Sequence, residues 1–209
     1  MVIEKKKLKV LELFSGTESF SKVARARGYQ TFTVDNDPRF KPDLCIDIMD
    51  LNIKDIPFKP DIVWASPPCQ SFSVASIGRN WNKDHTPKTK EAQDSLDLVN
   101  NTIGIILSLN PKYFFIENPR GKLRKLINFE TRRTVSYCQY GDNRMKPTDI
   151  WTNNKSWKPK PICKNGDSCH VSAPRGSQTG TQGLKNSVER SVIPRSLCKE
   201  MLRSCENGA

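Results

Sequence analysis

Short apolar runs alternate with helical stretches along most of this 209-residue chain. Apolar runs bounded by turn residues are typical of buried strands, and apolar residues at every third or fourth position are typical of a helix. Strands are therefore expected near residues 8 to 14, 30 to 34, 44 to 46, 61 to 65, 112 to 116 and 133 to 138, and helices near 20 to 27 and 90 to 109. Strands that alternate with helices form βαβ units, so the pattern predicts an α/β fold with a doubly wound, mainly parallel sheet.

Four of the expected strands end in groups that can bind or react. A Gly/Ser/Thr turn around Gly16 follows the first strand, and Asp35 ends the second strand. A carboxylate roughly 20 residues after such a turn is commonly placed to bind a ribose. Cys69 follows the fourth strand, and Glu117 ends a later one. Ligands of open α/β sheets bind at the carboxyl ends of the strands, so these groups are expected at one edge of the sheet.

Cys69 stands directly after two prolines at the end of the apolar run 61 to 65. Paired prolines continue neither a helix nor a sheet ladder, so the cysteine is expected on a stiff loop. Such a loop, with Gln70 and Ser71 beside it, can present the sulfur to a polar ligand as a nucleophile requires. The simpler interpretation is that Cys69 is a small buried apolar residue.

Together these segments resemble the cytosine-C5 DNA methyltransferase family, whose cofactor is S-adenosylmethionine. The resemblance runs from Lys7 to about Thr152 and resumes near Ser187, and its most specific parts are Pro-Pro-Cys-Gln at 67 to 70 and Glu-Asn-Pro at 117 to 119. It implies a Rossmann-like methyltransferase sheet, methyl transfer to C5 of cytosine, and double-stranded DNA as the partner. Residues 187 to 197 are similar to the family's last motif, which packs back near the cofactor.

The resemblance also implies a role for each matching residue. Cys69 falls on the nucleophile and Glu117 on the carboxyl that engages the cytosine ring, while Arg144 and Lys146 are expected at the flipped cytosine or its phosphate. The residues expected to bind the cofactor are Phe14, Gly16, Thr17, Asp35, Asn36, Asp47, Ile48 and Pro67. For Asp35 and Asp47 the alternative is an ordinary capping or turn role, because Asp is frequent at such positions.

The chemistry explains why these residue types are needed. Cytosine C5 is a poor nucleophile. The thiolate of a cysteine with a modestly lowered pKa therefore adds to C6, while a carboxyl hydrogen-bonds or protonates N3. The base must be flipped out of the duplex, at an unstacking cost of a few kcal/mol.

Three departures from the family favour a catalytically impaired DNA-binding regulator of the same fold as an alternative. Glu18 stands where the family usually has a small glycine, Arg144 and Lys146 are arranged differently from the family's closely spaced arginines, and only 34 residues, 153 to 186, are left for target recognition. An RNA cytosine-C5 methyltransferase is a second alternative, because the catalytic motif does not contact the sugar, and binding to a 2'-OH would distinguish it. The short recognition segment also leaves room for a protein partner.

Cys163, Cys169 and His170 lie close together within that segment and are candidate ligands of a structural zinc ion. A fourth ligand is not evident from the spacing, although Cys138 or Cys205 is available. The alternative is that these are free thiols and a surface histidine.

Composition agrees with a DNA-acting protein. The formal net charge of +12 favours an anionic partner. An odd number of cysteines, 7, without regular spacing favours a reducing compartment, and with no transmembrane or signal segment expected the chain is placed in the cytoplasm, nucleoid or nucleus rather than secreted. The expected units are a cofactor-binding and catalytic domain at 1 to 152, the irregular recognition segment, and a C-terminal helix at 187 to 209 that packs on the catalytic domain. The polar stretch 73 to 90 is expected to be a mobile loop over the site.

Overall fold

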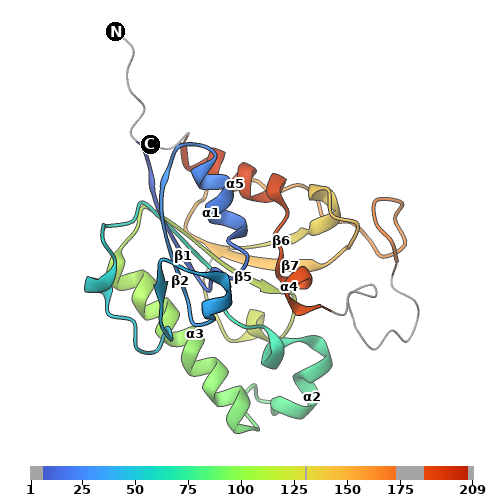
Figure 1. Cartoon of the computed structure of the whole chain (residues 1–209). Helices are drawn as coiled ribbons and strands as arrows, with labels where there is room; N and C mark the ends of the chain where they lie inside the picture. Colours follow the sequence, from blue (N-terminus) through green and yellow to red (C-terminus); the bar gives the residue numbers. More distant parts are fainter. Residues whose placement is uncertain (1–6, 130, 173–185, 207–209) are drawn as a thin grey trace.

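The computed structural model describes residues 7–129, 131–172 and 186–206, which form a seven-stranded sheet with helices on both faces (Figure 1). The strands are β1 (Lys9–Leu13), β2 (Gln30–Asp35), β3 (Leu44–Cys45), β4 (Ile62–Ala65), β5 (Tyr113–Pro119), β6 (Arg132–Ser136) and β7 (Pro147–Thr152). The α-helices are α1 (Ser19–Arg25), α2 (Ile77–Asn80), α3 (Lys90–Leu109), α4 (Ser187–Ser191) and α5 (Arg195–Glu206).

The strand order is β3-β2-β1-β4-β5-β7-β6. The first five strands in that order pair in parallel, and β7 pairs antiparallel to both β5 and β6. The order reverses between β1 and β4, and such a switch point is where an open α/β sheet forms its ligand crevice. The predicted doubly wound, Rossmann-like fold is therefore confirmed.

Strand β7 was not predicted from the sequence. It begins at Pro147, and polar residues Thr148 and Asp149 interrupt its apolar pattern although both side chains are fully buried. Asp149 is tolerated inside because Arg124 donates to both of its carboxylate oxygens, at 2.7 and 2.9 Å, and Thr134 donates to one at 2.7 Å. Buried charges normally require such pairing, and the paired groups are distant in sequence.

The alternation of side chains along the strands divides the core between the two faces. Val10, Trp64 and Phe115 face α1 and α5, whereas Leu11, Val63 and Ile116 face α3. The opposite placement of α3 and of the α1 and α5 pair is visible in Figure 1. Helix α5 buries one stripe, consisting of Leu197, Cys198, Met201, Leu202 and Cys205. Burying each large apolar side chain contributes about 1.5 to 3 kcal/mol, so the C-terminal helix is firmly bound to the rest of the fold.

One polar segment differs from its expected form, and another agrees with it. The polar stretch 73 to 90 contains α2, and Trp81 is buried with its indole N–H donating to the Ser71 carbonyl at 2.7 Å. Residues 153–172, all of them described, contain no helix or strand, in agreement with the expected irregular segment. Residues 173–185 of that segment and 207–209 of the C-terminal unit lie outside the described residues. None of the described helices is long and apolar enough to cross a membrane.

A close backbone approach joins the segments that follow β4 and β5. A Cβ atom added at Gly121, just after β5, would lie 2.2 Å from the carbonyl oxygen of Phe72. Phe72 belongs to the short 3-10 helix Gln70–Phe72 (η3), which directly follows Cys69. A glycine at 121 is therefore required for the Cys69 loop to pack against the end of β5.

This contact predicts that Gly121→Ala lowers the free energy of unfolding by about 1 to 3 kcal/mol, because the methyl group displaces backbone atoms. Gly104→Ala is the matched control: Gly104 is exposed in α3, nothing lies within 4 Å of its added Cβ, and alanine there raises helix stability by about 0.5 to 1 kcal/mol. Urea denaturation of the two variants measures both effects. Equal stability of Gly121→Ala and the unmodified chain would contradict the packing argument.

Candidate active site

The glycine turn and the acidic strand end lie next to each other at the carboxyl edge of β1 and β2. The Gly16 backbone N–H donates to the Asp35 carboxylate at 2.8 Å, and the Asp37 N–H donates to the other oxygen at 2.9 Å. Asp35 therefore fixes the loop that follows β1. Both of its oxygens accept one backbone hydrogen bond, and carboxylate oxygens have further acceptor capacity for hydroxyl donors.

The loop after β1 has an unusual backbone. Phe14, Gly16 and Glu18 have φ values of 56°, 42° and 55°, and no atom lies within 4 Å of a Cβ built on Gly16. The loop therefore leaves open space above Gly16 that a ligand can enter. The Glu18 carboxylate pairs with Arg25. The Glu18 charge, at the position where the family usually has a glycine, is therefore paired with a cation of the protein itself.

Glu12 is a functional candidate that sequence reasoning missed. Its buried carboxylate accepts the backbone N–H groups of Phe20 and Ser21 at 3.2 and 2.7 Å, so it fastens the start of α1 to β1. Burial raises the pKa of Glu12 to about 7, against the opposing hydrogen bonds. The sequence did carry a signal for Glu12, because it is a single acidic residue inside an apolar strand.

The remaining expected cofactor residues lie along the same edge. Thr17 shares a hydrogen bond of 3.0 Å with Ser19, whose hydroxyl accepts the backbone N–H of Ile193 at 3.2 Å. The C-terminal segment therefore packs next to the glycine turn. Asn36 is exposed at the end of β2.

After β3, Ile48 is buried, and its carbonyl accepts the side chain of Asn101 at 2.8 Å. Asp47 accepts the Met49 N–H at 2.9 Å, which is the turn role weighed as its alternative. One such bond leaves its second oxygen for another role.

The Cys69 loop is fastened at both ends. The carbonyl of buried Pro67 accepts the side-chain amide of Asn118 at 2.9 Å, and this bond joins the loop to β5. Beyond Cys69, Ser71 shares a hydrogen bond of 2.7 Å with Ser95 of α3. Cys69 itself is half-buried on this loop.

Glu117 is buried at the end of β5, two positions before the strand ends. The Tyr137 hydroxyl donates to its carboxylate at 2.9 Å. Burial raises the pKa of Glu117, while the cation of Lys146 and the Tyr137 hydrogen bond act in the opposite direction. The carboxyl is thus biased toward holding a proton.

Lys146 supplies the positive charge of the site. Its ammonium donates to the carbonyl of Arg190 at 2.9 Å and lies 4.6 Å from the centre of the Tyr137 ring. Burial lowers the pKa of Lys146, and the charges of Glu117 and Cys69 oppose that shift. We call Cys69, Glu117, Tyr137, Lys146 and Arg190 the Cys69 cluster, because their charges and hydrogen bonds act on one another.

Burial and the neighbouring Glu117 carboxylate raise the pKa of the Cys69 thiol, although Lys146 and Arg190 act to lower it. The lowered pKa expected from the sequence is therefore not found in the free protein. The physical reason is that desolvation of the thiolate outweighs the two cations.

Arg144 lies in the same region with its donors already engaged. Its guanidinium pairs with Asp142, donating through Nε at 2.8 Å, and Nη1 donates to the carbonyls of Glu189 and Arg190 at 3.3 and 3.4 Å. The side chain is 5% exposed. These contacts place α4 beside Lys146, so Arg144 is better suited to position the cluster than to contact a base.

Tyr137 and Asn118 were not predicted as site residues. Asn118 was visible in the Glu-Asn-Pro motif, but the position of its side chain toward Pro67 depends on the packing of β5 beside β4. Tyr137 reaches Glu117 only because β7 brings the end of β6 to the same sheet.

The three expected metal ligands come together with a fourth. Cys163, Cys169 and His170 lie beside Cys138, and the four ligand atoms are within 4.8 Å of one another. Cys205, the other candidate, is buried in α5 against Asn154 instead.

Comparison with known proteins agrees with the motifs. The model of the C-5 cytosine-specific DNA methylase family matches residues 8–136. A relative named "Probable DNA (cytosine-5)-methyltransferase" from Frog virus 3 (isolate Goorha) is 32% identical over 219 aligned positions, which cover 95% of this chain and 100% of the relative.

One solved structure shares the fold at low identity. A putative DNA modification methyltransferase encoded within a prophage (E. coli) has a TM-score of 0.51 and 18% identity, with 75% of this chain and 52% of that chain covered. S. pombe Dnmt2 methyltransferase has a TM-score of 0.43 and 19% identity, with 69% and 48% covered. The chain thus spans about half the length of these solved structures.

The Cys69 cluster predicts how fast Cys69 is alkylated at each pH. Only the thiolate reacts with iodoacetamide. The raised pKa of Cys69 should therefore shift its rate profile to higher pH than that of an ordinary cysteine, whose pKa is about 8.5. Glu117→Gln removes the negative neighbour and should move the profile to lower pH. Lys146→Met removes a cation and should move it to higher pH.

Peptide mass spectrometry separates Cys69 from the other cysteines in this measurement. Exposed Cys45 is the internal reference, because neither substitution changes its surroundings. Shifts of the same sign in the two variants would disprove the electrostatic account.

Proposed function

Because this chain belongs to the C-5 cytosine-specific DNA methylase family, we propose that it transfers a methyl group from S-adenosylmethionine to C5 of cytosine in double-stranded DNA, with Cys69 as the nucleophile. The observation that carries the proposal is the hydrogen bond from Asn118 to Pro67, which fastens the Cys69 loop to the strand that bears Glu117. The Glu117 carboxyl, which is biased toward its protonated form, then acts on the pKa of the Cys69 thiol within one cluster.

The carboxyl edge of β1, β2 and β3 fits the cofactor. The open space above Gly16 suits close approach of a ligand to the backbone, and Asp35 offers acceptor oxygens to ribose hydroxyls. We propose that Phe14 and Thr17, which flank Gly16, belong to the first cofactor loop, and that Asn36, which follows Asp35, lies at the adenine face. Asp47 and Ile48, which follow β3, would lie at the adenine edge, and Pro67 would close the inner side of the site. S-adenosylmethionine supplies the electrophilic methyl group when it is bound there.

Cys69 is proposed to form a bond from its sulfur to C6 of the flipped cytosine. The thiol must first lose its proton, because the thiolate is the nucleophile. In the free protein burial and Glu117 oppose this loss, whereas Lys146 favours it. The negative charge leaves the sulfur and enters the ring as the bond forms. The Lys146 cation would stabilise this charge first on the sulfur and then on the ring.

Glu117 is proposed to donate a hydrogen bond or a proton to N3 as this charge builds. Its raised pKa keeps the carboxyl protonated over a wider pH range than an exposed glutamate, and the Tyr137 hydroxyl fixes its orientation. Protonation at N3 draws the ring electrons into an enamine, whose C5 is the carbon that accepts the methyl group. The C5 hydrogen then leaves as a proton, the C6 to sulfur bond breaks, and Cys69 is regenerated.

Both the net charge of the chain and its family favour DNA as the substrate. The net charge of +12 suits a polyanion, and flipping places a single base at the edge of the sheet without further opening of the duplex. We therefore place the protein where DNA is present, in the cytoplasm, nucleoid or nucleus. We further propose that the short segment 153–186 reads few bases, which leaves a role for a protein partner.

Duplex DNA with 5-fluorocytosine at the target tests the mechanism. Fluorine does not leave as a cation, so the thioether persists and the enzyme should be trapped on DNA when S-adenosylmethionine is present. Cys69→Ser should abolish trapping, because an alcohol is scarcely ionised near neutral pH. Glu117→Gln should slow trapping by about 10²-fold to 10⁴-fold, the usual contribution of a positioned acid, with little change in DNA affinity.

The control variant for trapping is Cys45→Ser, which removes an exposed thiol and should trap like the unmodified chain. Mass spectrometry locates the linkage, and a linkage elsewhere than Cys69 would refute the assignment. Labelled methyl transfer to RNA instead of DNA would identify the RNA enzyme. Cofactor binding without any adduct or product would identify the non-catalytic binder.

A further inference from the structure

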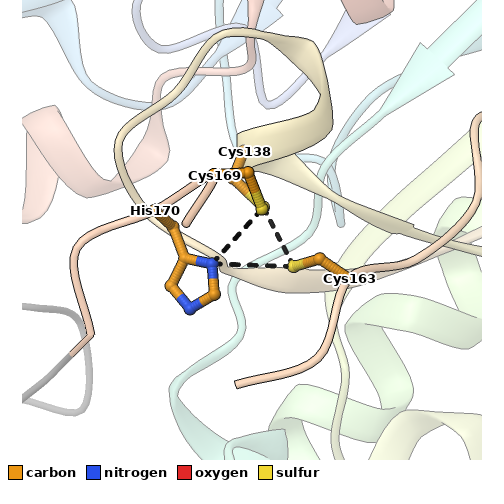
Figure 2. A group of neighbouring side chains, drawn as sticks. All are labelled: Cys138, Cys163, Cys169 and His170. Atoms are coloured by element: carbon orange, nitrogen blue, oxygen red, sulfur yellow. Dashed lines mark hydrogen bonds between the residues drawn. The ribbon is translucent and has the colours of Figure 1, made fainter. Parts of the chain in front are cut away.

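Three cysteines and a histidine from two separate parts of the chain converge on one point (Figure 2). Cys138 lies on the 3-10 helix Tyr137–Tyr140 (η6) that follows β6, while Cys163, Cys169 and His170 come from the irregular segment after β7. The sulfur atoms and the imidazole point toward one another in Figure 2. We infer that these four side chains bind one structural Zn²⁺ ion.

The spacing of the ligand atoms suits a tetrahedral ion. With Zn–S bonds of about 2.3 Å and Zn–N bonds of about 2.0 to 2.1 Å, neighbouring sulfurs should be about 3.8 Å apart and a sulfur and nitrogen about 3.6 Å apart. The Cys169 and Cys138 sulfurs are 3.6 Å apart, and His170 Nδ1 lies 3.5 and 3.8 Å from the sulfurs of Cys169 and Cys163. The Cys138 and Cys163 sulfurs, at 3.0 Å, would separate slightly around the ion.

The donor set selects zinc and a structural role. Three thiolates and one imidazole form one of the usual closed zinc shells, whereas a catalytic zinc keeps one position for water or substrate. The thiols release their protons to solvent on binding, because only thiolates ligate the ion, and His170 binds as the neutral imidazole through Nδ1.

The segment that supplies most of the ligands has little else to fold it. Of the residues from 158 to 172, all of which the structure describes, only Cys163 is buried. Hydrogen bonds also attach it to the rest of the fold, such as Cys163 N–H to Ser136 at 3.3 Å and Val171 N–H to Asn143 at 2.9 Å. A segment without an apolar core normally requires a metal or disulfide, so ion binding supplies the folding free energy.

The ion would also join this segment to the Cys69 cluster. Cys138 follows Tyr137 directly, and Tyr137 donates to Glu117. The zinc therefore anchors the proposed recognition segment to the same turn that orients the candidate acid. This consequence rests on the proposed function, whereas metal binding itself does not.

Metal analysis of the full chain, purified with reductant and without chelator, should give about one zinc per chain. Replacement by Co²⁺ should produce the intense visible bands of tetrahedral cobalt with thiolate charge transfer. His170→Ala should lose the metal, and His170→Cys should retain it with a changed cobalt spectrum, since four thiolates are also a closed shell. Cys45→Ser, at an exposed cysteine outside the cluster, should keep full metal content.

Hydrogen exchange should show loss of protection from 157 to 172 in His170→Ala and in the chelated chain, with recovery on adding zinc. Zinc-free protein with all thiols reduced would overturn the inference, as would zinc retained by His170→Ala and Cys163→Ser together. A disulfide between Cys138 and Cys163 in protein isolated without reductant would overturn it too. None of these measurements uses methyl transfer. The zinc inference can therefore be refuted without refuting the proposed function, and the proposed function can be refuted without refuting the zinc inference.

Discussion

The Asn118 amide that donates to the Pro67 carbonyl is the interaction on which the candidate site depends. A single neutral hydrogen bond contributes only about 0.5 to 1.5 kcal/mol, so its importance is positional. It joins the segment after β4 to β5, and the close packing of Gly121 against Phe72 closes the same junction from the other side. Two prolines remove most of the loop's own freedom. Cys69 is therefore placed relative to Glu117 by three independent constraints, none of which involves the reacting atoms.

Burial and the neighbouring charges act in opposite directions on the pKa values of the site. Taking Cys69, Glu117 and Lys146 out of water disfavours the charged form of each, which raises the pKa of both acids and lowers that of the base. Mutual attraction of opposite charges then partly restores the ionised forms. A substrate that draws negative charge from sulfur into its ring changes this balance. In the free protein burial and Glu117 consequently favour the neutral thiol of Cys69 over the thiolate.

Much of the sheet follows from local pattern, because parallel strands buried on both faces read as continuous apolar runs. The residues on strand ends, Asp35, Cys69 and Glu117, were found in sequence for the same reason: the edge of a parallel sheet is fixed by where each run stops. β7 was missed because its buried polar residues are satisfied by partners such as Arg124, which are distant in sequence. Tyr137 was missed with it as a site residue, and Cys138 was only one of two candidates for the fourth metal ligand. Their positions depend on how β6 and β7 join the sheet, and no local pattern encodes that antiparallel pairing.

The turn from Tyr137 to Tyr140 shows how a small chain can connect two sites through few residues. Tyr137 points into the sheet and donates to Glu117, Cys138 faces the metal ligands, and the Tyr140 hydroxyl accepts the backbone N–H of Lys160. Tyr140 also donates to Glu200 of α5 at 2.9 Å, which binds the turn to the C-terminal helix. Successive residues of one tight turn point in different directions, so a displacement of the turn moves all of these contacts together. Because only Cys163 is buried among residues 158–172, their position relative to the Cys69 cluster is set at this turn.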